Sequence, residues 1–171
     1  ANVIASDKTG TLTRNEMTVL RVVTASGRAE LTGTGYAPQG EVRADDGDAP
    51  QGPLREELLR ALAAAERASN AARLRQDGRW TVQGDPTEGA LIVAARKAGL
   101  SAEALDARYT RIGEVPFSSE RKMMSTVHRD AEDRERLTVF AKGAPDVLLE
   151  RCTHELVAGE PVPLSAARRA E

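Results

Sequence analysis

Three strand-like runs in direct succession constrain the fold of this chain more than any other feature. They occupy residues 109–115, 122–128 and 136–142, and each contains β-branched and apolar residues. The middle run alternates, so its even-numbered residues share one face of the expected strand. Strands that follow one another directly favour antiparallel pairing, with helices packed on the sheet. The sequence therefore predicts an α+β fold, an antiparallel β-sheet flanked by helices.

Two helices are indicated by a proline in the first turn, where its fixed φ suits a helix. One begins at Pro53 and repeats leucine at helical spacing as far as residue 62. The other runs from Pro86 to about Lys97 and stops before Gly99. The remaining expected elements are strands at 1–5, 17–25 and 79–83, a loop at 32–52, and a short helix from residue 144.

Composition limits the classes of function. Of the 171 residues, 40% are hydrophobic, which is enough to bury the core of one domain. The 24 lysines and arginines nearly balance 26 acidic residues, and this argues against a nucleic-acid-binding protein. The single cysteine, Cys152, excludes an internal disulfide framework and a multi-cysteine metal site. No apolar run approaches the roughly 18 residues of a membrane span, so we expect this piece by itself to be soluble, and monomeric.

The strongest chemical signal is the run Ser-Asp-Lys-Thr-Gly-Thr-Leu-Thr at residues 6–13, directly after the first expected strand. An aspartate held there can act as a nucleophile that forms an aspartyl-phosphate. The run resembles the signature of the P-type ATPases, in which the first aspartate, here Asp7, is phosphorylated by ATP. Related phosphatases of the haloacid dehalogenase type carry a second aspartate where this chain has a threonine, so we expect a longer-lived phosphoenzyme. The resemblance makes the phosphorylation loop Lys8, Thr9, Gly10 and Thr11.

The second motif is Gly-Asp-Pro-Thr-Glu-Gly-Ala-Leu at residues 84–91. Its local physics predicts a helix start, with Asp85 as the N-cap and Glu88 reaching back to the cap in a capping box. This structural interpretation needs no ligand. In the P-type ATPases a very similar run lines the nucleotide pocket, and the resemblance places Glu88 near the adenine amino group. The two roles are compatible.

The third motif contains Phe117 in a Pro-Phe-Ser corner between two expected strands. Such a phenylalanine is most often a core residue. The resemblance implies a different role, because the family stacks adenine on the matching ring, and it makes Lys122 a pocket lysine. Ser119 stands where animal calcium pumps have an arginine, which bears on one phosphate contact.

The fourth motif is Phe-Ala-Lys-Gly-Ala-Pro at residues 140–145, just before an expected helix. Alternation puts Phe140 and Lys142 on one face of the strand. A lysine there can bind phosphate as a point charge, and Gly143 permits close approach of the backbone. The alternative is a surface lysine before a turn. In the family this lysine lies deep in the ATP pocket.

Three weaker features received structural interpretations. The acidic cluster at residues 45, 46 and 48 is expected to be a solvated loop rather than a cation site. The segment 33–38 resembles part of the bacterial calcium-pump-like members and is treated as structural. His128 and His154 are isolated, and we expect solvated side chains rather than metal ligands.

The resemblance as a whole implies two parts, residues 1–16 from the dehalogenase-like phosphorylation domain and 17–171 from a nucleotide-binding domain that can continue beyond residue 171. It implies Mg-ATP as the ligand and partners in the rest of one longer chain: phosphorylation, actuator and transmembrane domains. The full protein is then expected to couple ATP hydrolysis to cation transport, with calcium preferred, at the cytoplasmic face of a membrane, in bacteria the plasma membrane. The metal site needs segments that this sequence does not contain, so the piece alone should bind ATP without turnover.

Two other classes of function stay open at this point. One is a stand-alone phosphatase or phosphotransferase of the dehalogenase superfamily, which Thr9 and the adenine-pocket motifs disfavour. The other is a non-catalytic nucleotide-binding module, which describes the isolated piece.

Overall fold

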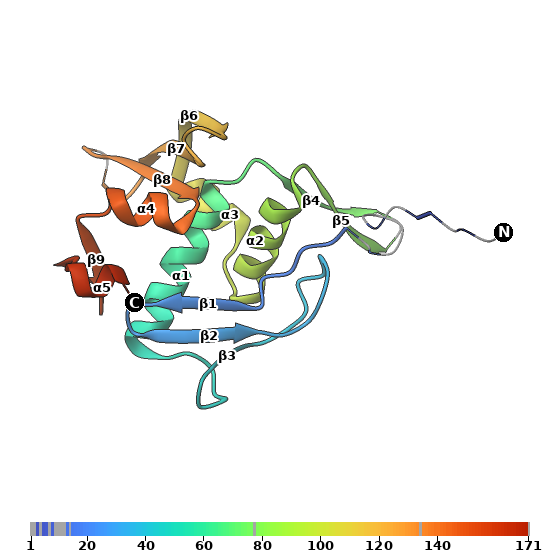
Figure 1. Cartoon of the computed structure of the whole chain (residues 1–171), viewed down its shortest axis with the longest axis horizontal. Helices are drawn as coiled ribbons and strands as arrows, with labels where there is room; N and C mark the ends of the chain where they lie inside the picture. Colours follow the sequence, from blue (N-terminus) through green and yellow to red (C-terminus); the bar gives the residue numbers. More distant parts are fainter. Residues whose placement is uncertain are drawn as a thin grey trace.

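The computed structural model describes residues 3, 5–6, 8, 13, 15–76, 78–133 and 135–170 (Figure 1). Its helices are α1 (Gly52–Arg67), α2 (Pro86–Lys97), α3 (Ala102–Arg108), α4 (Pro145–Arg151) and α5 (Ala166–Ala170). Its strands are β1 (Arg21–Thr24), β2 (Gly27–Leu31), β3 (Val42–Ala44), β4 (Ala72–Gln76), β5 (Arg79–Gln83), β6 (Tyr109–Ser118), β7 (Met123–Asp130), β8 (Leu137–Gly143), β9 (His154–Val157) and β10 (Glu160–Pro163). No helix in these ranges combines the length and apolar character needed to cross a membrane.

The α+β fold is confirmed, with the strands divided among small sheets rather than joined in one. Two sheets have three strands, in the orders β1-β2-β3 and β6-β7-β8, and two are hairpins, β4-β5 and β9-β10. Every pairing is antiparallel. In Figure 1 helix α1 passes between the two larger sheets, and α2 lies beside it. The sheets are therefore connected through α1.

The main core forms where α1 meets α2 and the β1–β3 sheet. Leu58 and Leu62 are each 2% exposed and pack with Ala29 and Leu31 of β2 and with two alanines of α2. The two leucines are four residues apart, so they lie on one face of the helix as the leucine repeat predicts. Burying each side chain contributes roughly 1.5–3 kcal/mol. This core fixes α1 and α2 relative to each other.

The β6–β8 sheet buries the face that carries the even-numbered residues of β7. Thr126 and His128 are both fully buried, and the ring of Phe140 lies 5.2 Å from the ring of His128. The prediction of a solvated His128 is wrong, because alternation puts this residue on the same inward face as Thr126. The imidazole Nε2 lies 3.0 Å from the hydroxyl of Thr126. Burial lowers the pKa of His128, partly offset by a hydrogen bond with the Tyr109 carbonyl, and nearby arginines lower it further.

The other differences concern short elements. Helix α2 and strand β5 have the predicted bounds, but β2, β3, β4, α3, the β9–β10 hairpin and α5 lack a strong sequence pattern and were not predicted. Strand β1 begins at Arg21, later than expected. Val3 and Ala5, the described part of the expected strand 1–5, lie outside any strand and are exposed. No described strand pairs with them.

Candidate functional site

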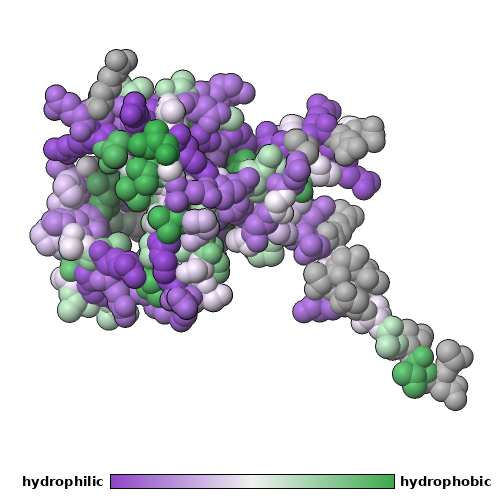
Figure 2. Space-filling view, turned by 90° about the horizontal axis from the view of Figure 1, so that it is seen from above, coloured by the Kyte–Doolittle hydropathy of each residue, from purple (hydrophilic) through white to green (hydrophobic). Residues whose placement is uncertain are grey.

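Residues of the second, third and fourth sequence motifs meet at a cavity of about 660 Å³. It lies between the first turn of α2, the end of β6 and the β7–β8 pair, with α1 behind it. Viewed from above relative to Figure 1, the surface is mostly hydrophilic, with a compact hydrophobic group beside a hollow (Figure 2). The cavity is lined by Ala65, Asp85, Thr87, Glu88, Leu91, Phe117, Met124, Lys142 and Gly143.

Phe117 contributes an aromatic ring near the end of β6. The register between β6 and β7 is irregular between Val115 and Ser118, so the strand bends at this point. Phe117 is 61% exposed, although it is one of the few aromatic residues of the chain. A phenylalanine whose role was core packing would be buried. The exposure therefore argues against the core interpretation and leaves the ring accessible from the cavity.

Glu88 is the most connected side chain of the site. It is 8% exposed, and its Oε2 accepts hydrogen bonds from the backbone amides of Asn70 (2.7 Å) and Ala71 (2.9 Å). Its Oε1 accepts from Nζ of Lys142 at 2.6 Å. The expected capping box is thus only half present, because the Glu88 carboxylate points away from the Asp85 amide to these partners. A charged group with this much burial needs such partners to offset desolvation.

Asp85 caps α2 as predicted. Its carboxylate accepts from the backbone amides of Thr87 (2.8 Å) and Glu88 (3.1 Å). Burial alone would raise the pKa of Asp85, but these hydrogen bonds and the charge of Lys142 outweigh it and lower the pKa. The cap fixes the first turn of α2 and, through it, the position of Glu88.

Lys142 and Gly143 end strand β8. The side chain of Lys142 is 23% exposed and reaches the cavity from the inner face of the sheet. A Cβ atom on Gly143 would lie 2.4 Å from the carbonyl oxygen of Lys122 and 2.5 Å from Cβ of Met123. The Lys122 carbonyl also accepts a hydrogen bond from the Ala144 amide at 3.0 Å. Glycine is therefore required here because the chain between β6 and β7 crosses directly over it.

The cavity does not collect every residue that the sequence proposed. Lys122 lies in the turn before β7 with a φ of 51°, its side chain is exposed, and it is not among the lining residues. Its role in a pocket stays a prediction. Of the phosphorylation motif, Lys8 is described, and its carbonyl accepts from the amide of Thr13 at 3.1 Å. Asp7, Thr9, Gly10 and Thr11 lie outside the described residues.

Sequence reasoning gave no individual role to three apolar lining residues, Ala65, Leu91 and Met124, although Leu91 and Met124 lie within or next to the predicted motifs. Ala65 lies in α1, outside every motif, and only the tertiary arrangement brings it to the cavity. Within the described ranges no three His, Cys, Asp or Glu side chains gather in a way that could hold a metal ion.

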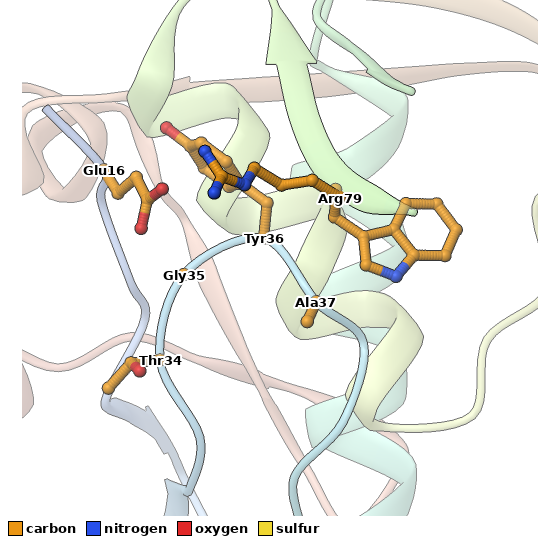
Figure 3. Close-up of a pocket in the computed structure, with 7 residues that line it drawn as sticks. Glu16, Thr34, Gly35, Tyr36, Ala37 and Arg79 are labelled. Atoms are coloured by element: carbon orange, nitrogen blue, oxygen red, sulfur yellow. The ribbon is translucent and has the colours of Figure 1, made fainter. Parts of the chain in front are cut away.

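A second cavity, of about 440 Å³, lies between the loop before β3 and the start of β5. The carboxylate of Glu16 and the guanidinium of Arg79 extend toward each other from opposite sides, above the loop that carries Gly35 and Tyr36 (Figure 3). Tyr36 lines it while being only 8% exposed, so its ring also serves packing. This burial agrees with the structural interpretation of segment 33–38.

Comparison with known proteins identifies the family of this chain. The family model described as P-type ATPase, cytoplasmic domain N, matches residues 55–171. This chain belongs to the P-type ATPase family. The match contains every residue that lines the 660 Å³ cavity. It starts inside α1, so it does not test the expected boundary at residue 16.

Individual relatives of this P-type ATPase chain are found in bacteria and animals. A probable cation-transporting ATPase F of Mycobacterium tuberculosis is 46% identical over 155 residues, covering 90% of this chain and 17% of the relative. A calcium-transporting ATPase of Bacillus subtilis is 41% identical over 174 residues, covering 100% and 19%. The human calcium-transporting ATPase type 2C member 1 is 43% identical over 171 residues, covering 98% and 18%. The chain thus spans less than a fifth of these relatives.

Proposed function

We propose that this chain is the ATP-binding portion of a P-type cation-transporting ATPase, with ATP held in the 660 Å³ cavity. The observation that carries the proposal is the meeting of Phe117, Glu88, Lys142 and Gly143 around one cavity, with Phe117 exposed to it. A ring with this exposure can stack on a nucleobase. Stacking of this kind contributes roughly 1–3 kcal/mol per base in nucleic-acid complexes.

The polar groups of the cavity suit the two ends of a nucleotide. A carboxylate offers about four acceptor positions, and Glu88 uses three of them in its bonds to Lys142 and two backbone amides. A fourth acceptor position is available to the exocyclic amine of adenine. Lys142 supplies the positive charge for phosphate oxygens. The Met124 and Leu91 side chains give the apolar walls that a base prefers.

The ion pair between Lys142 and Glu88 sets the balance of charge in the cavity. Because the two groups neutralise each other at 2.6 Å, a triphosphate has to compete with Glu88 for the ammonium group. We therefore expect phosphates to add less affinity here than an unpaired lysine would provide. Adenosine alone should retain a measurable share of the binding.

The activity of the whole protein follows from family membership and is part of the proposal. The Asp7 carboxylate attacks the γ-phosphorus of ATP, the bond to the β-phosphate oxygen breaks, and ADP leaves. Mg²⁺ bound to the phosphates would neutralise part of their charge. Water then hydrolyses the aspartyl-phosphate, and this cycle drives a cation across a membrane from its cytoplasmic face. Among the possible cations we propose calcium, because two of the three relatives described above are named calcium-transporting ATPases.

Calorimetric titration of the purified chain with ATP, ADP and adenosine tests the nucleotide site. We expect saturable binding of all three ligands, with ATP the tightest, and no release of phosphate above background. An absence of binding at millimolar ATP would overturn the proposal. Steady phosphate release from a small phosphomonoester, lost in Asp7→Asn, would instead favour a phosphatase of the dehalogenase superfamily.

A further inference from the structure

A third cavity, of about 320 Å³, lies on the other side of the loop that connects α1 to β4. The elements α1, α2, α3 and β4 surround it, and they lie close together in Figure 1. Its charged lining residues are Glu66, Arg67, Arg73, Arg96 and Asp106. It shares no lining residue with the proposed ATP cavity.

The two carboxylates of this cavity are already paired with arginines. Glu66 is 5% exposed, and its two oxygens accept from Arg96 at 2.5 and 2.6 Å. Arg67 also approaches Glu66, at 3.1 Å, and its other terminal nitrogen pairs with Asp106, whose side chain is 69% exposed. Three guanidinium groups therefore face one buried carboxylate and one that is solvated. The buried part of the cavity carries an excess of positive charge.

Two arginine nitrogens of this cavity are buried donors without an acceptor. In the described parts of the chain, two buried side-chain polar atoms have no hydrogen-bond partner, Nε of Arg67 and Nη1 of Arg73. Both belong to residues that line this cavity. Buried donors without partners are rare and call for a ligand, an ion or water to accept from them. Burial lowers the pKa of Arg73, the charge of Arg96 lowers it further, and the charge of Glu66 offsets only part of this shift.

We propose that this cavity binds a small oxyanion of the phosphate class, held by Arg73 and Arg67 beside Arg96. Guanidinium groups present planar donors that match the oxygens of phosphate. The volume is near the lower limit of ligand cavities, which favours a small ion over a nucleotide. The site is separate from the proposed ATP cavity, although the two border the same loop. The Ala71 residue of this loop lines the oxyanion cavity and donates its amide to Glu88.

The chain contains its own optical probe of this site. Trp80 is the single tryptophan, and the guanidinium carbon of Arg73 lies 4.1 Å from the centroid of its ring. An anion that binds Arg73 should change the fluorescence of Trp80. Arg75 provides a matched control, because its guanidinium lies 5.7 Å from the same ring but does not line the cavity.

The experiment is a titration with inorganic phosphate, followed by calorimetry and by Trp80 fluorescence, with sodium chloride of equal ionic strength as the reference. We expect saturable binding of phosphate and none of chloride. Arg73→Gln should weaken binding about tenfold or more, as expected for the loss of a charge-assisted hydrogen bond. Arg75→Gln should bind as the parent chain does. A parallel titration with glycerol phosphate distinguishes a free ion from a phosphomonoester.

A second variant keeps the test decisive if Arg73→Gln alters the fold. Ala102 lines the cavity in the first turn of α3, where a carboxylate is compatible with the helix dipole. Ala102→Glu should therefore fold normally, verified by its circular dichroism, and should weaken phosphate binding by adding negative charge. The proposal is overturned if phosphate does not bind, or if it binds folded Arg73→Gln and Ala102→Glu as tightly as the parent.

Discussion

Replacing Phe117 with alanine separates a stacking platform from a core residue. Phe117 is 61% exposed, so about two-fifths of its surface is buried. Truncating a fully buried phenylalanine costs roughly 3–5 kcal/mol, and scaling by the buried share gives about 1–2 kcal/mol. For a domain of this length, each kcal/mol lowers Tm by roughly 2–4 °C. We expect a fall in Tm of about 2–8 °C, with the protein still folded.

The same substitution should have a larger effect on nucleotide binding. Loss of base stacking removes roughly 1–3 kcal/mol, which raises Kd about five- to 150-fold. The loss should be similar for ATP and adenosine, because the ring contacts the base and not the phosphates. Calorimetric titration and thermal melting on the same preparation measure both quantities.

Leu137→Ala is the matched control for Phe117→Ala. Leu137 is 60% exposed and lies in β8 of the same sheet, but it does not line the cavity. Its removal should change Tm by a similar small amount and leave ATP affinity unchanged. A fall in Tm well above 10 °C for Phe117→Ala, with Kd unaltered in the folded fraction, would refute the stacking role.

Three further predictions concern the lysine, the glycine and the buried histidine. Lys142→Ala should weaken ATP binding more than adenosine binding, because the ammonium is assigned to the phosphates; equal losses in a titration would assign it to the base or to support of Glu88. Gly143→Ala should lower the urea concentration at the midpoint of unfolding, because the new Cβ would lie 2.4 Å from the Lys122 carbonyl oxygen. Gly113→Ala is the control and should not, because no atom lies within 4 Å of its Cβ position. Equal midpoints for the two variants would contradict this packing. Burial lowers the pKa of His128, so the folded state binds fewer protons than the unfolded state. The contribution of His128 to the free energy of unfolding is therefore fully present above the ordinary pKa of about 6.5 and falls as the pH decreases below it. Urea unfolding at several pH values should show this slope in the parent chain and a smaller one in His128→Gln; identical slopes would exclude His128 as the cause.

Local patterns predicted the elements that position the ATP cavity. The proline and the Asp85 cap located the start of α2 to the residue, and alternation placed Lys142 on the same face of β8 as Phe140. These features depend on neighbours within about four residues, which a sequence displays directly. Alternation in β7 also placed His128 on one face with Thr126, but it did not show which face is buried. The sheet packs with that face inward, so the histidine expected to be solvated is fully buried.

Long-range contacts explain what the sequence could not show. Capping rules assigned the Glu88 carboxylate to its own helix, yet its partners are Asn70, Ala71 and Lys142, up to 54 residues away. A capping box satisfies one backbone donor, whereas the observed bonds satisfy two and add an ion pair. The longer-range arrangement therefore satisfies more buried polar groups, and a local rule cannot anticipate it.

The bonds of Glu88 also give the site a dependence on the loop between α1 and β4. Because Asn70 and Ala71 hold one carboxylate oxygen, a shift of this loop would move Glu88 and with it the ammonium of Lys142. Ser69 and Ala71 of the same loop line the arginine-rich cavity. An anion drawn to Arg73 would therefore act on a loop that positions both charged groups of the proposed ATP site. The two cavities share no lining residue, but α1 and α2 each contribute adjacent residues to both, so this loop is one of three elements that lie between them.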